Sequence, residues 1–291
     1  MSFGERLAAL IRARRSAVCV GIDPRPDRIP AELWPQGLVQ PERPEAIEQA
    51  LVAFGEALVA AAAGAAVAVK PQLAFFERHG WRGLRAFSRI AAAARDAGLI
   101  VLADAKRGDI GSTAEAYAAA FFTRNADFAA DAVTINPYLG GDAIAPFAAY
   151  APEKGLFILA KTSNLSSGEL QDRRVRGRPL YEWVVRLAQS WCDERTGSLG
   201  LVVGATYPRE LARVRALAPG AWILVPGYGA QGGGAADAAP AFRADGGGAL
   251  VSASRSIAEA YVRTGEPLQD AARREIEQMR AALWAVGGGR S

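Results

Sequence analysis

A single-domain (β/α)8 barrel over residues 1–291 is the fold class that the sequence predicts. Eight short runs rich in Val, Ile or Leu recur along the chain with little polar–apolar alternation, which is typical of parallel strands buried on both faces. Their starts lie 23 to 49 residues apart, so every gap can hold a helix. Eight such units in 291 residues fit a (β/α)8 barrel. A doubly wound sheet is the alternative, although it usually has fewer strands.

The elements can be placed in order from the same pattern. Met1–Arg15 is amphipathic, and we expect it to form a helix that caps the domain. Between the strands, the clearest helical segments are Gly83–Ala97 and Pro208–Ala218. The expected strands are Ala17–Ile22, Ala66–Val69, Leu99–Ala103, Asp131–Asn136, Gly155–Ala160, Leu199–Gly204, Trp222–Val225 and Ala249–Ala253.

Two gaps between strands are longer than one helix needs. Residues 24–49 contain six prolines, so we expect a structured excursion from the barrel rather than a linker. Residues 162–198 are expected to form a long loop that carries the basic run Arg173–Arg178. Neither gap has the character of a domain boundary, so one domain is predicted.

Composition excludes several classes of protein. Apolar residues make up 51% of the chain and charged residues 22%, which supports a large core and excludes a disordered, collagenous or disulfide-stapled chain. The longest nearly apolar run, Ala57–Val69, is too short for a membrane span, and the N-terminus lacks a secretory apolar region, so a cytoplasmic protein is expected. Two cysteines and one histidine exclude Cys-rich and His-pair metal sites, and Cys19 is expected to be a reduced core thiol. The net charge of +4 suits an anionic small molecule as well as nucleic acid.

Charged side chains gather where the predicted strands end, which is the active-site face of a (β/α)8 barrel. The chain has only four lysines, and three of them (Lys70, Lys106 and Lys161) lie at these ends. Asp104 and Lys106 are two residues apart and should both face the barrel mouth, with Asp109 at the following turn. With Lys70 they would alternate ammonium and carboxylate groups. Such an array can hold an anion or deliver a proton; a structural ion-pair network is the alternative.

A glycine-rich segment, Pro226–Gly234, follows the seventh predicted strand. It contains the G-x-G-x-x-G pattern of dinucleotide-binding folds, but the next strand ends in Ser254-Arg255 rather than in an acidic residue. In (β/α)8 barrels, the loops after strands seven and eight are the usual phosphate site. We therefore expect Gln231, Arg255 and main-chain N–H groups to bind a phosphate.

Together these motifs resemble the orotidine 5'-phosphate decarboxylase family, in particular its longer bacterial subgroup, over about residues 16–257. The D-x-K-x-x-D box alone is shared with related phosphosugar decarboxylases and aldolases, whereas the box, Lys70 and the glycine-rich segment together are very specific. The segments that carry the resemblance are Val20–Pro24, Lys70–Gln72, Asp104–Thr113, Lys161–Asn164, Pro226–Gly233 and Ser254–Ser256.

The resemblance implies decarboxylation of orotidine 5'-monophosphate (OMP) to uridine 5'-monophosphate (UMP), the last step of de novo pyrimidine synthesis, with no metal and no organic cofactor. It implies that Lys106 protonates C6 of the base beside Asp104 as carbon dioxide leaves. It also implies a homodimer in which Asp109, with Ile110 and Thr113, reaches into the partner's site. The implied substrate contacts are Asp23 and Lys70 at the ribose, Ser163 at the pyrimidine, Gln231 between ring and phosphate, and Arg255 at the phosphate, with Pro226 and Ser254 as further binding residues.

Three other functions stay open. A Mg-dependent β-keto phosphosugar decarboxylase or aldolase shares the box but typically has glutamate where Lys70 stands. A Schiff-base aldolase would use Lys161 as its nucleophile, and a nucleic-acid-binding protein would use Arg173–Arg178. The decarboxylase accounts best for the lysines at the strand ends, so neither nucleic acid nor a membrane is expected as a partner.

Overall fold

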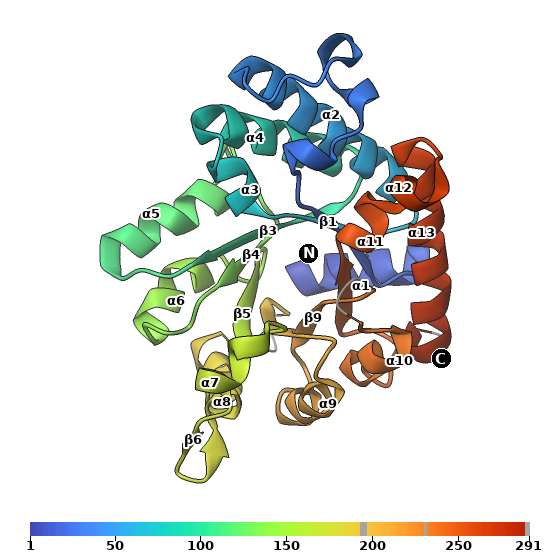
Figure 1. The fold of residues 1–291 in the computed structure, drawn as a ribbon. Coiled ribbons are helices and arrows are strands. Elements are labelled where there is room, and N and C mark those ends of the chain that lie inside the picture. The colour runs from blue at the N-terminus through green and yellow to red at the C-terminus, as the bar shows by residue number, and fades with distance from the viewer. Residues whose placement is uncertain (193–196, 230–231, 289–291) are drawn as a thin grey trace.

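In the computed structural model, the eight predicted strands close into one parallel barrel (Figure 1). The structure describes residues 1–192, 197–229 and 232–288. Around the barrel the order is β1-β10-β9-β8-β5-β4-β3-β2, so the barrel prediction is confirmed and the doubly wound alternative is wrong. The barrel strands are β1 (Val18–Ile22), β2 (Ala68–Pro71), β3 (Ile100–Arg107), β4 (Ala132–Ile135), β5 (Gly155–Lys161), β8 (Leu199–Val203), β9 (Trp222–Pro226) and β10 (Ala249–Ala253).

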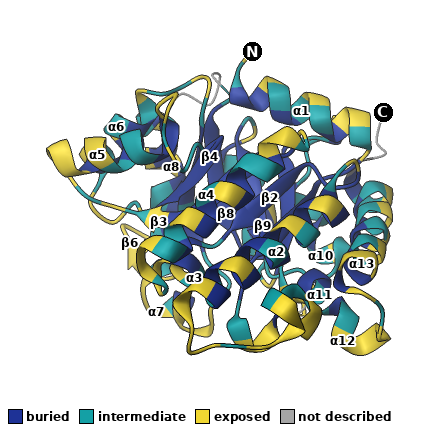
Figure 2. Ribbon diagram, turned by 90° about the horizontal axis from the view of Figure 1, so that it is seen from above, coloured by how far each residue is buried: buried dark blue, intermediate teal, exposed yellow. Residues whose placement is uncertain are grey.

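Helices surround the barrel, and the strands inside them are buried (Figure 2). The segments predicted as the clearest helices are α4 and α9, although α4 begins three residues earlier than expected. The helices are α1 (Phe3–Arg14), α2 (Pro44–Ala62), α3 (Leu73–Glu77), α4 (Gly80–Asp96), α5 (Gly111–Phe122), α6 (Gly141–Ala148), α7 (Gly168–Gln171), α8 (Leu180–Trp191), α9 (Pro208–Leu217), α10 (Ala235–Ala238), α11 (Arg255–Ala258), α12 (Ala260–Thr264) and α13 (Leu268–Leu283).

Two strands, β2 and β3, differ from the prediction by two residues or more at a boundary. β2 begins two residues later, because the N–H of Ala66 still donates to the carbonyl of Ala62 in the turn that follows α2. β3 continues four residues beyond Ala103 to Arg107, past the point where the apolar run ends. Asp104 and Lys106 of the box are thus part of a barrel strand, whereas Asp109 lies in the loop that follows it.

Helix α1 caps the barrel, as predicted. Its start is defined by a capping box in which Ser2 Oγ accepts from the Glu5 N–H and the Glu5 carboxylate accepts from the Ser2 N–H. Phe3, Leu7 and Ile11 are buried in a cluster to which β2, β3, β4 and β9 contribute their first residues. The helix therefore closes the N-terminal end of the barrel and leaves the C-terminal end open.

The proline-rich segment 24–49 is structured, as predicted, but it ends earlier than predicted, where α2 begins. Ile29 and Trp34 are buried in the main core and anchor the segment to it. Its last six residues already belong to α2, which Pro44 starts at a position where a helix needs no N–H donor. The excursion proper contains three 3₁₀ turns, Pro26–Arg28, Ala31–Leu33 and Pro35–Gly37.

The prediction of a long loop over 162–198 is wrong for its second half. Residues 180–191 form α8, whose Tyr181, Val185 and Ala188 are buried with the i, i+4, i+7 spacing of an amphipathic helix. Before α8, the basic run forms a short hairpin of β6 (Arg174–Val175) and β7 (Arg178–Pro179) that projects from the barrel (Figure 1). The two residues of its turn have positive φ, as primed hairpin turns require. Residues 193–196 of the predicted loop lie outside the described residues.

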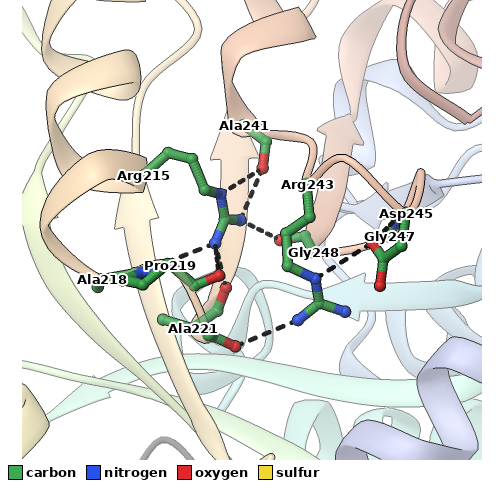
Figure 3. A network of polar contacts seen from close by, with 10 residues as sticks. Arg215, Ala218, Pro219, Ala221, Ala241, Arg243, Asp245, Gly247 and Gly248 are labelled. Atoms are coloured by element: carbon green, nitrogen blue, oxygen red, sulfur yellow. Dashed lines mark hydrogen bonds and ion pairs between the residues drawn. The ribbon is translucent and has the colours of Figure 1, made fainter. Parts of the chain in front are cut away.

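Arg215 of α9 holds the loops that enter β9 and β10 (Figure 3). Its guanidinium donates to carbonyls at the start of both strands, at 2.7 Å to Ala221 O and 2.8 Å to Gly248 O. Further main-chain acceptors are Ala218, Pro219 and Ala241. This contact and helix α1 both stabilise the end of the barrel where the strands begin.

Both cysteines are buried and neither forms a disulfide bond, which confirms the prediction for Cys19. Burial raises the pKa of the Cys19 thiol to about 12, so the thiol is protonated at neutral pH. Within the described residues, no helix is long and apolar enough to cross a membrane.

Replacing Leu7 by alanine should lower the free energy of unfolding by about 3 kcal/mol, because its side chain is completely buried under the barrel. Urea denaturation measures the change. The matched control is Arg12→Ala on the exposed face of the same helix, which should change stability by less than about 0.5 kcal/mol. Equal effects of the two substitutions would contradict the role of α1 as a cap.

Candidate active site

A cavity of about 900 Å³ opens at the C-terminal end of the barrel. Its lining combines the ends of the strands with residues of α8 and of the loops that follow the strands, which is where active sites of (β/α)8 barrels lie. Eight of the residues predicted from the sequence line this one cavity: Asp23, Lys70, Asp104, Lys106, Ser163, Pro226, Ser254 and Arg255. Another predicted residue, Gln231, lies outside the described residues.

The carboxylate of Asp104 is the centre of a cluster of polar side chains at this cavity. Its Oδ2 accepts from Lys70 Nζ at 2.7 Å and from Gln72 Nε2 at 2.9 Å. Its Oδ1 accepts from Lys106 Nζ at 2.5 Å and from Thr134 Oγ1 at 2.9 Å. The predicted alternation of ammonium and carboxylate groups is therefore present for three of its four members.

Burial and charge act in opposite directions on this group. Burial by itself would raise the pKa of Asp104, but the positive charges of Lys70 and Lys106 outweigh it and lower that pKa below its usual range. Burial would likewise lower the pKa of Lys70, but the nearby Asp104 and Asp23 outweigh it and raise that pKa. The carboxylate and the buried ammonium thus remain charged at neutral pH. Lys106 is the more accessible ammonium, with 45% of its side chain exposed compared with 7% for Lys70.

The side chains of Asp104 and Lys106 meet as predicted, but the strand between them is not regular. Ala103 pairs with Val133 and Arg107 pairs with Ile135, so three residues of β3 lie opposite a single residue of β4. Within this bulge Lys106 has a φ of 48°, a left-handed conformation that costs a residue with a Cβ about 1–2 kcal/mol. Simple alternation along a strand therefore does not explain why Lys106 faces Asp104.

Asp23 follows β1 and presents an unsatisfied acceptor at the cavity. Its Oδ1 is buried and has no hydrogen-bond partner among the described residues. Gly21, two residues earlier, is required by close packing, because a Cβ there would lie 1.8 Å from Ser254 Oγ. The ends of β1 and β10 are thereby held close together, and Asp23 and Arg255 both line the cavity.

The described residues of the glycine-rich segment after β9, 226–229 and 232–234, are not followed by a long helix of the dinucleotide-binding kind, because α10 has only four residues. Gly227, Gly229 and Gly232 have positive φ, and Gly229 N–H donates to Gly233 O at 2.8 Å. Arg255 begins α11 and lines the same cavity as Gly227, and among the described residues it has no carboxylate within ion-pair distance. An unpaired guanidinium beside a glycine-rich main chain is suited to bind a phosphate.

Three predicted residues do not line the cavity of their own chain. Asp109 and Ile110 lie in the loop between β3 and α5, and Thr113 is in the first turn of α5. Ile110 is 54% exposed, and the neighbouring loop after β4 exposes Tyr138 (78%) and Leu139 (48%). An exposed apolar surface therefore lies beside the cavity at the ends of β3 and β4.

The side chains on which the Schiff-base aldolase and the nucleic-acid-binding alternatives depend do not line the cavity. Lys161 is completely buried and outside the cavity lining, and both oxygens of Asp172 accept from its Nζ, at 2.7 and 2.8 Å. An ammonium held in this way is not available to form a Schiff base with a ligand in the cavity. The basic run Arg173–Arg178 is exposed on its hairpin, as a solvated loop would be.

Sequence reasoning missed Gln72 and Thr134 as partners of Asp104. Gln72 stands two residues after Lys70 and so points to the same side of the strand, which was a usable signal. Thr134 is the one hydroxyl residue in an apolar run, but its position opposite the bulge in β3 cannot be read from local sequence.

Comparisons with known proteins agree with this geometry. Residues 16–267 match the family described as "Orotidine 5'-phosphate decarboxylase / HUMPS family". The chain is 43% identical to orotidine 5'-phosphate decarboxylase of Polaromonas naphthalenivorans, over 98% of this chain and 96% of that protein. It is 44% identical to the enzyme of Azoarcus sp., over 97% and 98% of the two chains. A solved structure of Leishmania donovani OMP decarboxylase is similar with a TM-score of 0.78 and 39% identity, over 98% of this chain and 99% of that one.

Asp104→Asn should flatten the acid dependence of stability. The Asp104 pKa is lower in the folded chain than in the unfolded chain, where it is about 3.9, so the ionised carboxylate stabilises the fold above that pH. This contribution is lost as the pH falls toward the folded-state pKa. Between about pH 5 and pH 2 the wild type should therefore lose more unfolding free energy than Asp104→Asn. Urea denaturation at each pH tests this, and parallel curves for the two proteins would contradict it.

Proposed function

The chain belongs to the orotidine 5'-phosphate decarboxylase / HUMPS family, and we propose that it converts OMP to UMP by decarboxylation. The observation that carries this proposal is the buried carboxylate of Asp104 between two ammonium groups, in the cavity that Asp23 and Arg255 also line. Relatives with this activity in their names match nearly the whole chain.

The reaction needs a proton donor next to C6 of the pyrimidine. When the bond between C6 and its carboxylate breaks, carbon dioxide leaves and the electron pair stays on C6 in an orbital that cannot delocalise into a carbonyl. The barrier must therefore fall by roughly 23 kcal/mol, near the top of the enzymatic range. In our proposal the Lys106 ammonium stabilises this negative charge and then donates a proton to C6. The resulting neutral amine recovers its proton from water.

Asp104 would keep that donor in place. Its carboxylate binds Lys106 Nζ at 2.5 Å and so orients the ammonium, which lines the cavity. Lys70 and Gln72 hold the other carboxylate oxygen, so Asp104 cannot rotate away. The substrate carboxylate would lie beside Asp104.

The rest of the substrate would be bound by residues farther along the rim. Arg255 and the glycine-rich segment would take the phosphate, with Gln231 between phosphate and ring. The free Oδ1 of Asp23 would accept from a ribose hydroxyl, assisted by Lys70. The remaining assigned contacts are Ser163 at the pyrimidine, with Pro226 and Ser254 as further binding residues. Phosphate binding far from C6 could then contribute energy to the chemical step.

The donor set disfavours the Mg-dependent alternative. A divalent cation needs free carboxylate oxygens, but each oxygen of Asp104 already accepts two hydrogen bonds. The position where those relatives typically have glutamate holds the ammonium of Lys70, which would repel a cation.

We further propose that the enzyme acts as a homodimer in which Asp109, Ile110 and Thr113 complete the partner's site. Their placement outside their own cavity and the exposed apolar surface at Ile110, Tyr138 and Leu139 support this. Location in the cytoplasm stays a prediction.

Lys106→Ala should lower kcat for OMP decarboxylation by at least about 10³-fold, because both the proton donor and its stabilising charge are removed. The loss of OMP absorbance with EDTA present measures the rate. Lys154→Ala, at a lysine outside the cavity lining, is the control and should keep wild-type kcat. No turnover by the wild type, or turnover that EDTA abolishes, would overturn the proposed function.

Mixing inactive Asp109→Ala and Lys106→Ala proteins should restore activity if sites are shared between subunits. Random exchange makes half of the dimers mixed, and one of the two sites in each mixed dimer is intact, so about a quarter of wild-type activity should return. The measurement is OMP turnover after subunit exchange. No recovery after confirmed exchange would contradict the shared site.

A further inference from the structure

Thr134 occupies a special place in the barrel. It is the single β4 residue opposite the three-residue bulge of β3, between the pairs Ala103–Val133 and Arg107–Ile135. A main-chain ladder cannot satisfy every β3 group there, because the two strands have unequal numbers of residues. Thr134 is only 1% exposed, and it also lines the cavity.

The Thr134 hydroxyl fills this gap with two hydrogen bonds. Oγ1 accepts from the main-chain N–H of Lys106 at 3.0 Å and contacts Asp104 Oδ1 at 2.9 Å. Because an ionised carboxylate can only accept, the hydroxyl hydrogen must point to Asp104. The Thr134 hydroxyl thus connects the main chain of Lys106 to the side chain of Asp104.

The contact falls where the strand is most strained. Lys106 has a φ of 48°, which a residue with a Cβ keeps only when its surroundings hold it there. The hydrogen bond from the Lys106 N–H to Thr134 Oγ1 ties this main-chain group to the neighbouring strand β4. Without it, Lys106 could relax toward an ordinary strand conformation, and its ammonium would turn away from Asp104.

We propose that Thr134 is a positioning residue for the decarboxylation, holding the Lys106 main chain and the Asp104 carboxylate in one arrangement. This inference rests on the proposed function. Thr134 acts through Lys106 and Asp104, so it affects the chemical step more than the binding of substrate. Its removal should lower kcat and leave KM almost unchanged.

The test compares substitutions that differ in the hydroxyl. Thr134→Val keeps the branched shape but removes the hydroxyl, and Thr134→Ser keeps the hydroxyl but removes the methyl group. For OMP decarboxylation we expect Thr134→Val to lower kcat about 30-fold with KM within about threefold of wild type, and Thr134→Ser to recover most of the loss. Thr264→Val, at an exposed threonine of α12, is the matched control and should keep wild-type kcat.

The outcomes separate the possible explanations. Wild-type kcat in Thr134→Val, an equal loss in Thr134→Ser, or parallel changes in kcat and KM would overturn the positioning role. If Thr134→Val does not give the wild-type circular dichroism spectrum, Thr134→Ala, which also lacks the hydroxyl, is assayed in its place under the same criteria. Absence of OMP turnover by the wild type would refute the proposed function itself, which is a separate result.

Discussion

The candidate site depends on a carboxylate with only 9% of its side chain exposed that remains ionised between two ammonium groups. A buried charge is tolerated only when it is paired and fully hydrogen-bonded. Asp104 meets this condition with four donors: Lys70 of β2, Gln72 directly after β2, Lys106 of β3 and Thr134 of β4. The positions of β2, β3 and β4 are therefore linked to one another through a single side chain.

This arrangement is costly, and the rest of the barrel offsets the cost away from the site. The strained conformation of Lys106 and the unsatisfied oxygen of Asp23 both lie at the C-terminal end. At the opposite end, α1 buries Phe3 and Leu7 in the barrel core, and Arg215 binds the carbonyls that enter β9 and β10. Stability and chemistry are thus located at opposite ends of the same strands, as in other (β/α)8 barrels.

The cavity joins two different environments. Asp23, Lys70 and Asp104 form a charged half, whereas Leu159, Val202 and residues of α8 line an apolar half. An apolar wall lowers the local dielectric and strengthens the interaction of an ammonium with nearby negative charge. Helix α8, which supplies part of this wall, lies within residues 162–198, the segment predicted to be a long basic loop.

Local sequence determined the eight strands, the capping helix and the gathering of charged residues at the strand ends, because buried parallel strands and amphipathic helices leave a period in the sequence. Motifs such as the D-x-K-x-x-D box identified eight of the residues that line the cavity, including its charged cluster. Only the tertiary structure decided that Thr134 and Gln72 complete the partners of Asp104, that Lys161 binds Asp172 away from the cavity, and that Asp109 lies outside the lining of its own chain. The physical reason is that a bulge, a cross-strand hydrogen bond and the direction of a side chain depend on which strands are neighbours, and no local pattern encodes that.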